Sequence, residues 1–158
     1  MFTASLHAIC SRPWRRTATL MATTALAAGT AQALCIQASE AKLRRGPGAH
    51  FPVTWEVFKF MPLQPVGKKG AWLRVRDLDG DTHWVHRQFI STRFRCAVVK
   101  FATARVRSAP RRDAPQTAIS PVKRYYAFRV VGQRRDWVAV RDEVGNSGWI
   151  AHQLLWVR

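Results

Sequence analysis

One segment of the chain occurs twice, and this repeat constrains the fold more than any other feature. The segment from Trp72 to Ile90 aligns without a gap with the segment from Trp137 to Leu155, at an offset of 137 − 72 = 65 residues. Seven of the 19 aligned positions are identical, and most of the others keep their apolar or polar character. An ungapped match of this length indicates two copies of one structural unit.

Each copy has the pattern of a β-hairpin. Trp72 to Val75 supplies aromatic and β-branched residues, Asp79-Gly80 predicts a two-residue turn, and His83 to Val85 resumes the strand. The second copy is expected to turn through Gly145-Asn146, with glycine providing positive φ. A hairpin alone is marginally stable in water, so each copy must recruit further strands. The residues predicted to be buried in two separate barrels are Trp72, Val75, Trp84, Val85, Trp137, Val140, Trp149 and Ile150.

The first 33 residues have the three parts of a secretory signal peptide. A basic stretch at 12–16 precedes an uncharged stretch rich in Ala, Thr and Leu, and Ala31-Gln32-Ala33 follows. We therefore expect cleavage after Ala33 and a secreted or periplasmic protein. Two alternatives are an N-terminal helix retained in the mature protein and a lipoprotein anchored at Cys35.

After residue 33, short alternating apolar runs separated by turn residues predict an all-β protein of small barrels or sandwiches. The repeat divides this part into two domains, residues 34–92 and residues 93–158. A domain of about 60 residues buries only about 60% of the surface of its unfolded chain, so we expect the two domains to contact each other.

A set of motifs in the first copy resembles the bacterial SH3 (SH3b) domain family. The motifs are Leu43 to Gly48, Phe51-Pro52, Trp72 to Val75 and Trp84-Val85. The second copy departs from the pattern at Ser108 to Arg111, which lacks both glycines. The resemblance implies two tandem small SH3-like β-barrels after the signal peptide. It implies a binding function and leaves the ligand open, because SH3-like barrels serve many functions.

The sequence offers little for catalysis or metal binding. No Gly-x-Ser-x-Gly, His-Glu-x-x-His or phosphate-cradling glycine loop occurs, and nine acidic residues are present in the whole chain. His83 and His86 point to opposite faces of a strand. Asp77, Asp79 and Asp81 resemble part of a calcium loop but fit a hairpin turn better. We expect no enzyme activity, no metal and no cofactor.

The charge indicates an anionic partner. The chain has 26 Lys and Arg residues against nine Asp and Glu, and removal of Arg12, Arg15 and Arg16 with the signal peptide leaves 23 basic residues and a net charge of about +14. The favoured function is a non-catalytic module that binds peptidoglycan or another anionic cell-wall or envelope polymer. The alternative is a periplasmic adaptor protein that recruits or regulates an envelope enzyme. Nucleic-acid binding fits the charge but conflicts with export.

Four residues of the first copy are the predicted ligand-binding site: Arg45, His50, Phe51 and Trp55. They lie in or soon after the Gly46-Pro47-Gly48 loop, which keeps the family pattern. The positions of four further aromatic residues separate the function classes. If they are exposed in a groove, saccharide or peptide recognition is favoured, and if they are buried, net charge is the remaining basis for binding. These residues are Phe58, Phe60, Tyr125 and Tyr126.

Cys35 and Cys96 are the two cysteines that remain after the predicted cleavage, and both begin a predicted strand. An oxidising compartment and an even number of cysteines predict a disulfide between them. The alternative is that each copy buries a free thiol at the same core position.

Overall fold

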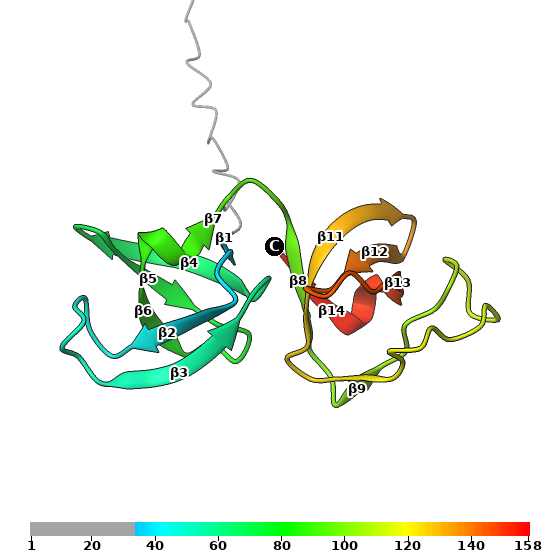
Figure 1. The fold of residues 1–158 in the computed structure, drawn as a ribbon, viewed down its shortest axis with the longest axis horizontal. Helices are drawn as coiled ribbons and strands as arrows, with labels where there is room; N and C mark the ends of the chain where they lie inside the picture. Colours follow the sequence, from blue (N-terminus) through cyan, green and yellow to red (C-terminus); the bar gives the residue numbers. More distant parts are fainter. Residues whose placement is uncertain (1–33) are drawn as a thin grey trace, which may run out of the picture.

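The structure consists of antiparallel strands in two halves. The computed structural model describes residues 34–158 (Figure 1), and the predicted signal peptide of residues 1–33 lies outside the described residues. The described range holds no α-helix and two short 3-10 helices. None of its helices is long and apolar enough to cross a membrane.

The first half forms one seven-stranded sheet with the strand order β3-β2-β6-β5-β4-β1-β7. Its elements are β1 (Leu34–Ile36), β2 (Glu40–Arg44), β3 (Val53–Phe58), β4 (Pro62–Lys69), β5 (Trp72–Arg76), β6 (Thr82–His86), the 3-10 helix η1 (Arg87–Phe89) and β7 (Ile90–Ser91).

The second half forms a five-stranded sheet with the order β13-β12-β11-β8-β14 and a separate pair, β10-β9. Its elements are β8 (Cys96–Val99), β9 (Thr103–Ala104), β10 (Val122–Lys123), β11 (Ala127–Arg134), β12 (Trp137–Arg141), β13 (Ser147–Ala151), the 3-10 helix η2 (His152–Leu154) and β14 (Leu155–Val157).

The repeat extends over the whole of both halves. The elements β4, β5, β6 and η1 recur as β11, β12, β13 and η2 at the 65-residue offset. The pair β2-β3 recurs as β9-β10, since Glu40 pairs with Phe58 and Thr103 with Lys123. The predicted all-β fold with two tandem SH3-like units is confirmed for the described residues.

The hairpin turns differ from the prediction by one residue. Arg76 pairs with Thr82, and the backbone N–H of Asp77 donates to the carbonyl of Asp81 at 3.0 Å, which leaves a three-residue loop from 78 to 80. Gly80 has φ of 94° and Gly145 has φ of 99° in the equivalent loop. The predicted two-residue turns are therefore wrong. The expectation that glycine provides a positive φ is correct, because Gly80 and Gly145 occupy the last loop position in the left-handed conformation.

The prediction that the repeated tryptophans belong to the core is also wrong. Trp72 lies on the same face of β5 as Arg74 and Arg76, while Val75 points to the opposite face and is fully buried. Trp84, Trp137 and Trp149 are half-buried on outer faces in the same way. Alternation along a strand separates two faces, and the charged residues identify the outer one. The predicted aliphatic residues Val75, Val85, Val140 and Ile150 are all buried.

Strand β8 forms a wall shared by both cores, so the barrels are not fully separate. All four of its residues are buried. Val98 packs in the first core with Leu63 and Val75, whereas Ala97 and Val99 pack in the second core with Phe128. Trp156 of β14 pairs with Val98 and also packs against the first core. The predicted contact between the domains therefore forms at β8, a strand without charged residues. One face of β8 packs in the second core and the other face is buried against the first domain.

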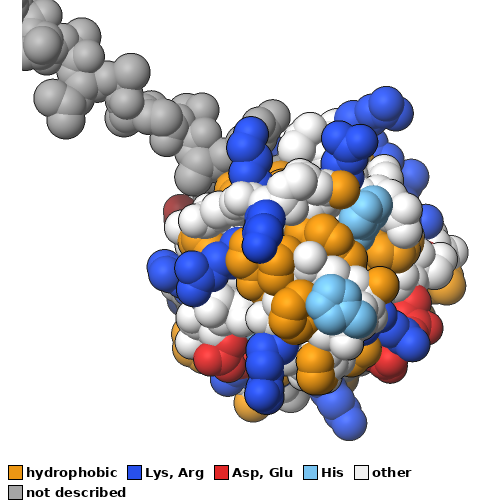
Figure 2. Space-filling view, turned by 90° about the vertical axis from the view of Figure 1, so that its left-hand side faces the viewer, with side chains coloured by type: hydrophobic (Ala, Val, Ile, Leu, Met, Phe, Trp, Pro, Cys, Tyr) orange, Lys and Arg blue, Asp and Glu red, His pale blue; other side chains and the backbone are white. Residues whose placement is uncertain are grey.

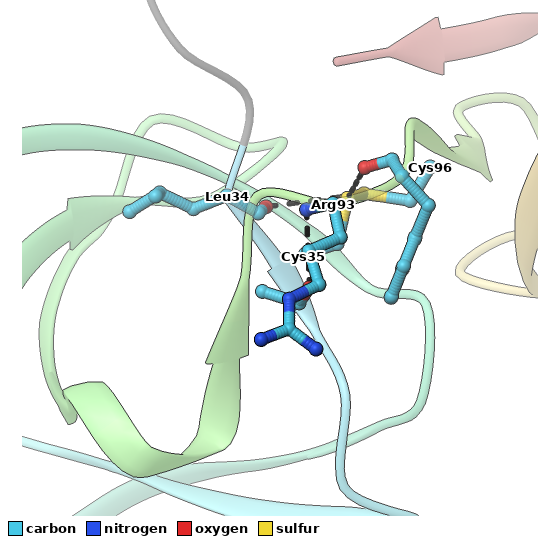
Figure 3. The surroundings of a disulfide bond; sticks show 6 residues. Leu34, Cys35, Arg93 and Cys96 are labelled. Atoms are coloured by element: carbon cyan, nitrogen blue, oxygen red, sulfur yellow. Dashed lines mark hydrogen bonds between the residues drawn. A yellow bond between two sulfur atoms is a disulfide. The ribbon is translucent and has the colours of Figure 1, made fainter.

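A disulfide joins the two halves beside this wall. Cys35 of β1 and Cys96 of β8 are bonded with a Cα–Cα distance of 6.0 Å and a sequence separation of 61 (Figure 3). Both cysteines are fully buried and pack with Phe60 and Phe94, whose ring centroids are 5.6 Å apart. Of the two alternatives for these cysteines, the structure contains the bridge.

Candidate binding groove between the domains

A groove of about 500 Å³ lies where strand β3 of the first domain faces the β10-β11 connection and the β12-β13 loop of the second. We call it the interdomain groove. Its aromatic residues are Trp55, Phe58, Tyr125 and Tyr126, its charged residues are Glu56, Lys59, Lys123, Arg124, Asp142 and Glu143, and the rest of its wall is formed by Val57, Met61, Ala127 and Val144.

Strand β3 supplies one wall because it is an edge strand of the first sheet. Val57 points into the first core, and Trp55 is half-buried against that core. Phe58, the last residue of the strand, is 62% exposed. Phe58 lines the groove together with two other exposed apolar residues, Tyr126 and Val144, and a patch of several such residues is typical of a binding surface.

A tight turn brings two tyrosines to the opposite wall. Tyr125 has φ of 68°, a left-handed conformation that non-glycine residues rarely adopt. Phe60 has the same φ at the equivalent turn of the first domain, where its ring packs against the disulfide. The ring of Tyr125 instead makes an edge-to-face contact with Trp55 at 5.3 Å. Both strained turns thus direct an aromatic ring into contacts between the domains.

Two carboxylates of the second domain, Asp142 and Glu143, contribute to the polar part of the groove. The Tyr126 hydroxyl donates to Asp142 Oδ2 at 3.0 Å, and Asp142 is buried. Burial, followed by the hydrogen bond to Asp142 and its negative charge, raises the pKa of Tyr126 above the ordinary value. Glu143 accepts a hydrogen bond from the Ser39 hydroxyl at 2.7 Å and lies 3.7 Å from Lys59 Nζ. Glu143 therefore links the two domains at one end of the groove.

A second link between the domains lies beside Trp55. Asp79 of the β5-β6 loop accepts hydrogen bonds from the Arg124 guanidinium and the Tyr125 hydroxyl. These bonds hold the turn at Tyr125 against the first domain. Lys123, two residues before this turn, is exposed and lines the groove.

The carboxylate of the neighbouring Asp77 stabilises the β5-β6 hairpin turn. Asp77 is buried, and its Oδ1 accepts hydrogen bonds from the backbone N–H groups of Asp79 and Asp81, both at 2.9 Å. Its Oδ2 lies 3.2 Å from His83 Nε2, and His83 Nδ1 lies 2.7 Å from the Thr54 hydroxyl. Within residues 34–158 no group of three or more His, Cys, Asp or Glu residues is placed to hold a metal ion.

The four predicted site residues do not come together. Arg45, His50 and Phe51 lie in the loop between β2 and β3, where the rings of His50 and Phe51 are 4.3 Å apart and Arg45 is exposed. Trp55 lies instead in the interdomain groove. Of the four further aromatic residues whose positions separate the function classes, Phe58, Tyr125 and Tyr126 line the interdomain groove. Phe60 is buried. Glu143 carried no signal, because its partners Ser39 and Lys59 belong to the other domain.

The loops after β2 and β9 have the same backbone hydrogen bonds although their sequences differ. The N–H of Arg45 donates to the carbonyl of Pro52 at 3.0 Å, and the N–H of Ser108 donates to that of Pro115 at 2.9 Å. In the first loop Arg44 Nη1 donates to the Phe51 carbonyl at 2.7 Å, and in the second Arg107 Nη1 donates to the Ala114 carbonyl at 2.6 Å. The missing glycines of the second copy therefore leave the path of the loop unchanged.

Comparison with known proteins agrees with this architecture. The family model described as "Bacterial SH3 domain" matches residues 37–92 and again residues 100–157. No curated protein matches the sequence.

Two of the solved structures that resemble the chain are an NlpC/P60 family protein from Bacillus cereus and NlpC2 from Trichomonas vaginalis. The first is 13% identical over 80% of this chain and 56% of its own, with a TM-score of 0.37. The second is 11% identical over 79% of this chain and 48% of its own, with a TM-score of 0.34. The chain therefore spans about half the length of each.

Proposed function

Because the chain belongs to the bacterial SH3 domain family and carries two copies of the domain, we propose that it is a non-catalytic binding module for peptidoglycan or another anionic component of the cell envelope. The proposal includes export through residues 1–33 to the periplasm or the cell exterior. The observation that carries it is the exposure of Phe58 and Tyr126 beside the half-buried Tyr125, in one groove with charged residues of both signs.

The groove has the chemistry that a peptide-bearing saccharide requires. The exposed ring of Phe58 offers a flat apolar surface for the C–H face of a sugar ring. The carboxylates of Glu56 and Glu143 can accept hydrogen bonds from sugar hydroxyls and amide N–H groups. Lys59 and Lys123 supply positive charge for the carboxylates of a peptide. A few polar groups on an apolar surface are typical of ligand sites.

Net charge supports the proposal over a longer range. The exposed end of the first domain carries Lys and Arg around hydrophobic and histidine side chains, with Asp and Glu side chains nearer its edges (Figure 2). A charge of this sign and size raises the rate of encounter with anionic polymers, and the effect weakens as salt screens it.

The test is co-sedimentation of the 34–158 protein with purified sacculi across a salt series. We expect retention that salt reduces, and a loss of affinity of about tenfold for Phe58→Ala, equivalent to about 1.4 kcal/mol. Phe101→Ala is the matched control, since Phe101 is a 51% exposed aromatic outside the groove. Equal effects of both variants would contradict binding in the groove.

A pull-down from periplasmic extract tests the adaptor alternative in parallel. Capture of one defined protein that Phe58→Ala abolishes, without retention by sacculi, would replace envelope binding by protein recruitment. Val144, 82% exposed at the rim of the groove, provides a second apolar contact that such a partner would need.

A further inference from the structure

Each domain carries a groove at the same place on its barrel, apart from the interdomain groove. The groove of the first domain lies between β2, the start of β5 and η1, and that of the second lies between β9, the start of β12 and η2. Every residue that lines the second groove has its counterpart, 63 or 65 residues earlier, in the lining of the first. The two grooves are therefore two versions of one repeated site.

The framework of the site is unchanged between the versions. Trp72 and its counterpart Trp137 form one wall. Arg44 and its counterpart Arg107 line both grooves, and each donates a hydrogen bond from Nη1 to a carbonyl of the adjacent loop. This arginine holds the loop against the barrel in both domains, so differences between the grooves arise from the remaining side chains.

The charges of the two versions differ strongly. In the second groove Arg105 is the counterpart of Lys42, and Arg112 is the counterpart of Ala49. Thr103 is the counterpart of Glu40, so the second groove lacks that carboxylate. The first groove thus combines a carboxylate with two cations. The second has the three guanidinium groups of Arg105, Arg107 and Arg112 and no carboxylate. Its volume is about 290 Å³, against about 570 Å³ for the first.

Two of the three guanidinium groups are free to bind a ligand. Within residues 34–158, neither Arg105 nor Arg112 makes a side-chain hydrogen bond or an ion pair. Asp113, the acidic residue next to Arg112 in the chain, pairs with Arg111 at 2.5 Å. Like charges brought together without a counter-charge repel one another, and an anion with more than one negative charge would relieve this repulsion.

We propose that the second domain binds a phosphorylated saccharide in this groove, with the phosphate held by Arg105 and Arg112 and the sugar ring packed against Trp137. Guanidinium groups bind phosphate oxygens through paired charge-assisted hydrogen bonds. A phosphate monoester, with a charge of about −1.5 to −2 at neutral pH, offsets most of the positive charge, which a single carboxylate would not. Trp137 is half-buried, so part of the indole remains open to a sugar ring.

The experiment is an NMR titration of the uniformly ¹⁵N-labelled 34–158 protein. The indole N–H signal of Trp137, assigned with Trp137→Phe, reports on the site. The probes are N-acetylglucosamine 1-phosphate, inorganic phosphate and N-acetylglucosamine. We expect a saturable shift of the Trp137 signal with the sugar phosphate, a weaker effect with inorganic phosphate and none with the unphosphorylated sugar. Equal binding of both sugars would overturn the proposal, and equal binding of inorganic phosphate would overturn the role of Trp137.

Variants separate a site from general attraction by charge. Arg112→Ala restores the residue of the first domain, and we expect it to weaken sugar-phosphate binding at least about tenfold, the effect of one charge-assisted hydrogen bond. Arg129→Ala removes an exposed arginine of the same domain that lies outside the groove and pairs with Arg141 in the sheet, and it should leave affinity nearly unchanged. Equal losses in both variants would refute the site.

The reciprocal change keeps the proposal testable if Arg112→Ala fails to fold. Glu40→Thr combined with Ala49→Arg gives the first groove the charges of the second, and the indole signal of Trp72 should then shift with the sugar phosphate. No shift of that signal would contradict the assigned roles. Because Phe58 lines neither of these grooves, the sacculus experiment and this titration fail independently.

Discussion

Replacement of Gly46 by alanine is predicted to destabilise the first domain only while the ring of Phe51 is present. A Cβ at position 46 would lie 2.5 Å from Phe51 Cδ1, well inside the normal contact distance. In the second domain Ala109 occupies the position of Gly46, and the small residue Ala114 occupies that of Phe51. The two loops share their backbone hydrogen bonds. Glycine at position 46 is thus required by a side chain, since its φ is not positive.

The size of the effect follows from two opposing terms. Forcing an extra methyl group into a packed site costs about 1–3 kcal/mol. Alanine also lowers the entropy of the unfolded chain, which stabilises the protein by about 0.4–1 kcal/mol. We expect Gly46→Ala to lower the free energy of unfolding by about 1–2 kcal/mol. In a Phe51→Ala background the first term vanishes, and the same change should be neutral or stabilising.

The assay is urea unfolding of the four proteins of this double-mutant cycle, followed by tryptophan fluorescence and circular dichroism. Coincident transitions from the two signals justify a two-state treatment. Gly67→Ala is the control, because a Cβ there would meet its nearest neighbour, Arg74 Cβ, at an ordinary distance of 3.6 Å. An equal cost of Gly46→Ala with and without the Phe51 ring would refute the steric explanation.

Three further predictions concern stability. Cys35→Ser combined with Cys96→Ser should lower the free energy of unfolding by about 4 kcal/mol through loop-closure entropy, and an unchanged melting temperature would contradict this. Because the folded state raises the pKa of Tyr126, that residue stabilises the fold below the unfolded pKa of about 10 and loses this effect as pH rises through the folded pKa. Urea unfolding at pH of about 9 and about 11 should show a smaller alkaline loss for Tyr126→Phe than for the wild type, and equal losses would exclude the linkage. Phe128→Ala, at a fully buried position, should cost about 3–5 kcal/mol, and thermal melts should show a smaller loss for Trp149→Ala on the outer face.

The sequence by itself was sufficient to predict what depends on neighbouring residues. The repeat gave two units of one fold, and the alternation around Val75 and Val85 placed these residues in the core. Glycine at positions 80 and 145 marked the left-handed turn residues. These features depend on hydrogen bonds and side-chain directions that are fixed within a few residues of the chain. The inward placement of the tryptophans was wrong because Trp72 alternates with Val75 along β5 and shares the outer face with Arg74 and Arg76.

The binding surfaces required the tertiary structure. Phe58 and Tyr126 line one groove because strand β8 docks the two barrels against each other. Their positions in the sequence do not reveal that they lie close together in space. Arg105 and Arg112 likewise meet Trp137 only when the loop after β9 folds back on η2 and β12. Contacts of this kind depend on the packing of whole elements against one another. A local sequence pattern determines which residues lie on each face of a strand. Which other elements pack against that face depends on how the complete core is buried.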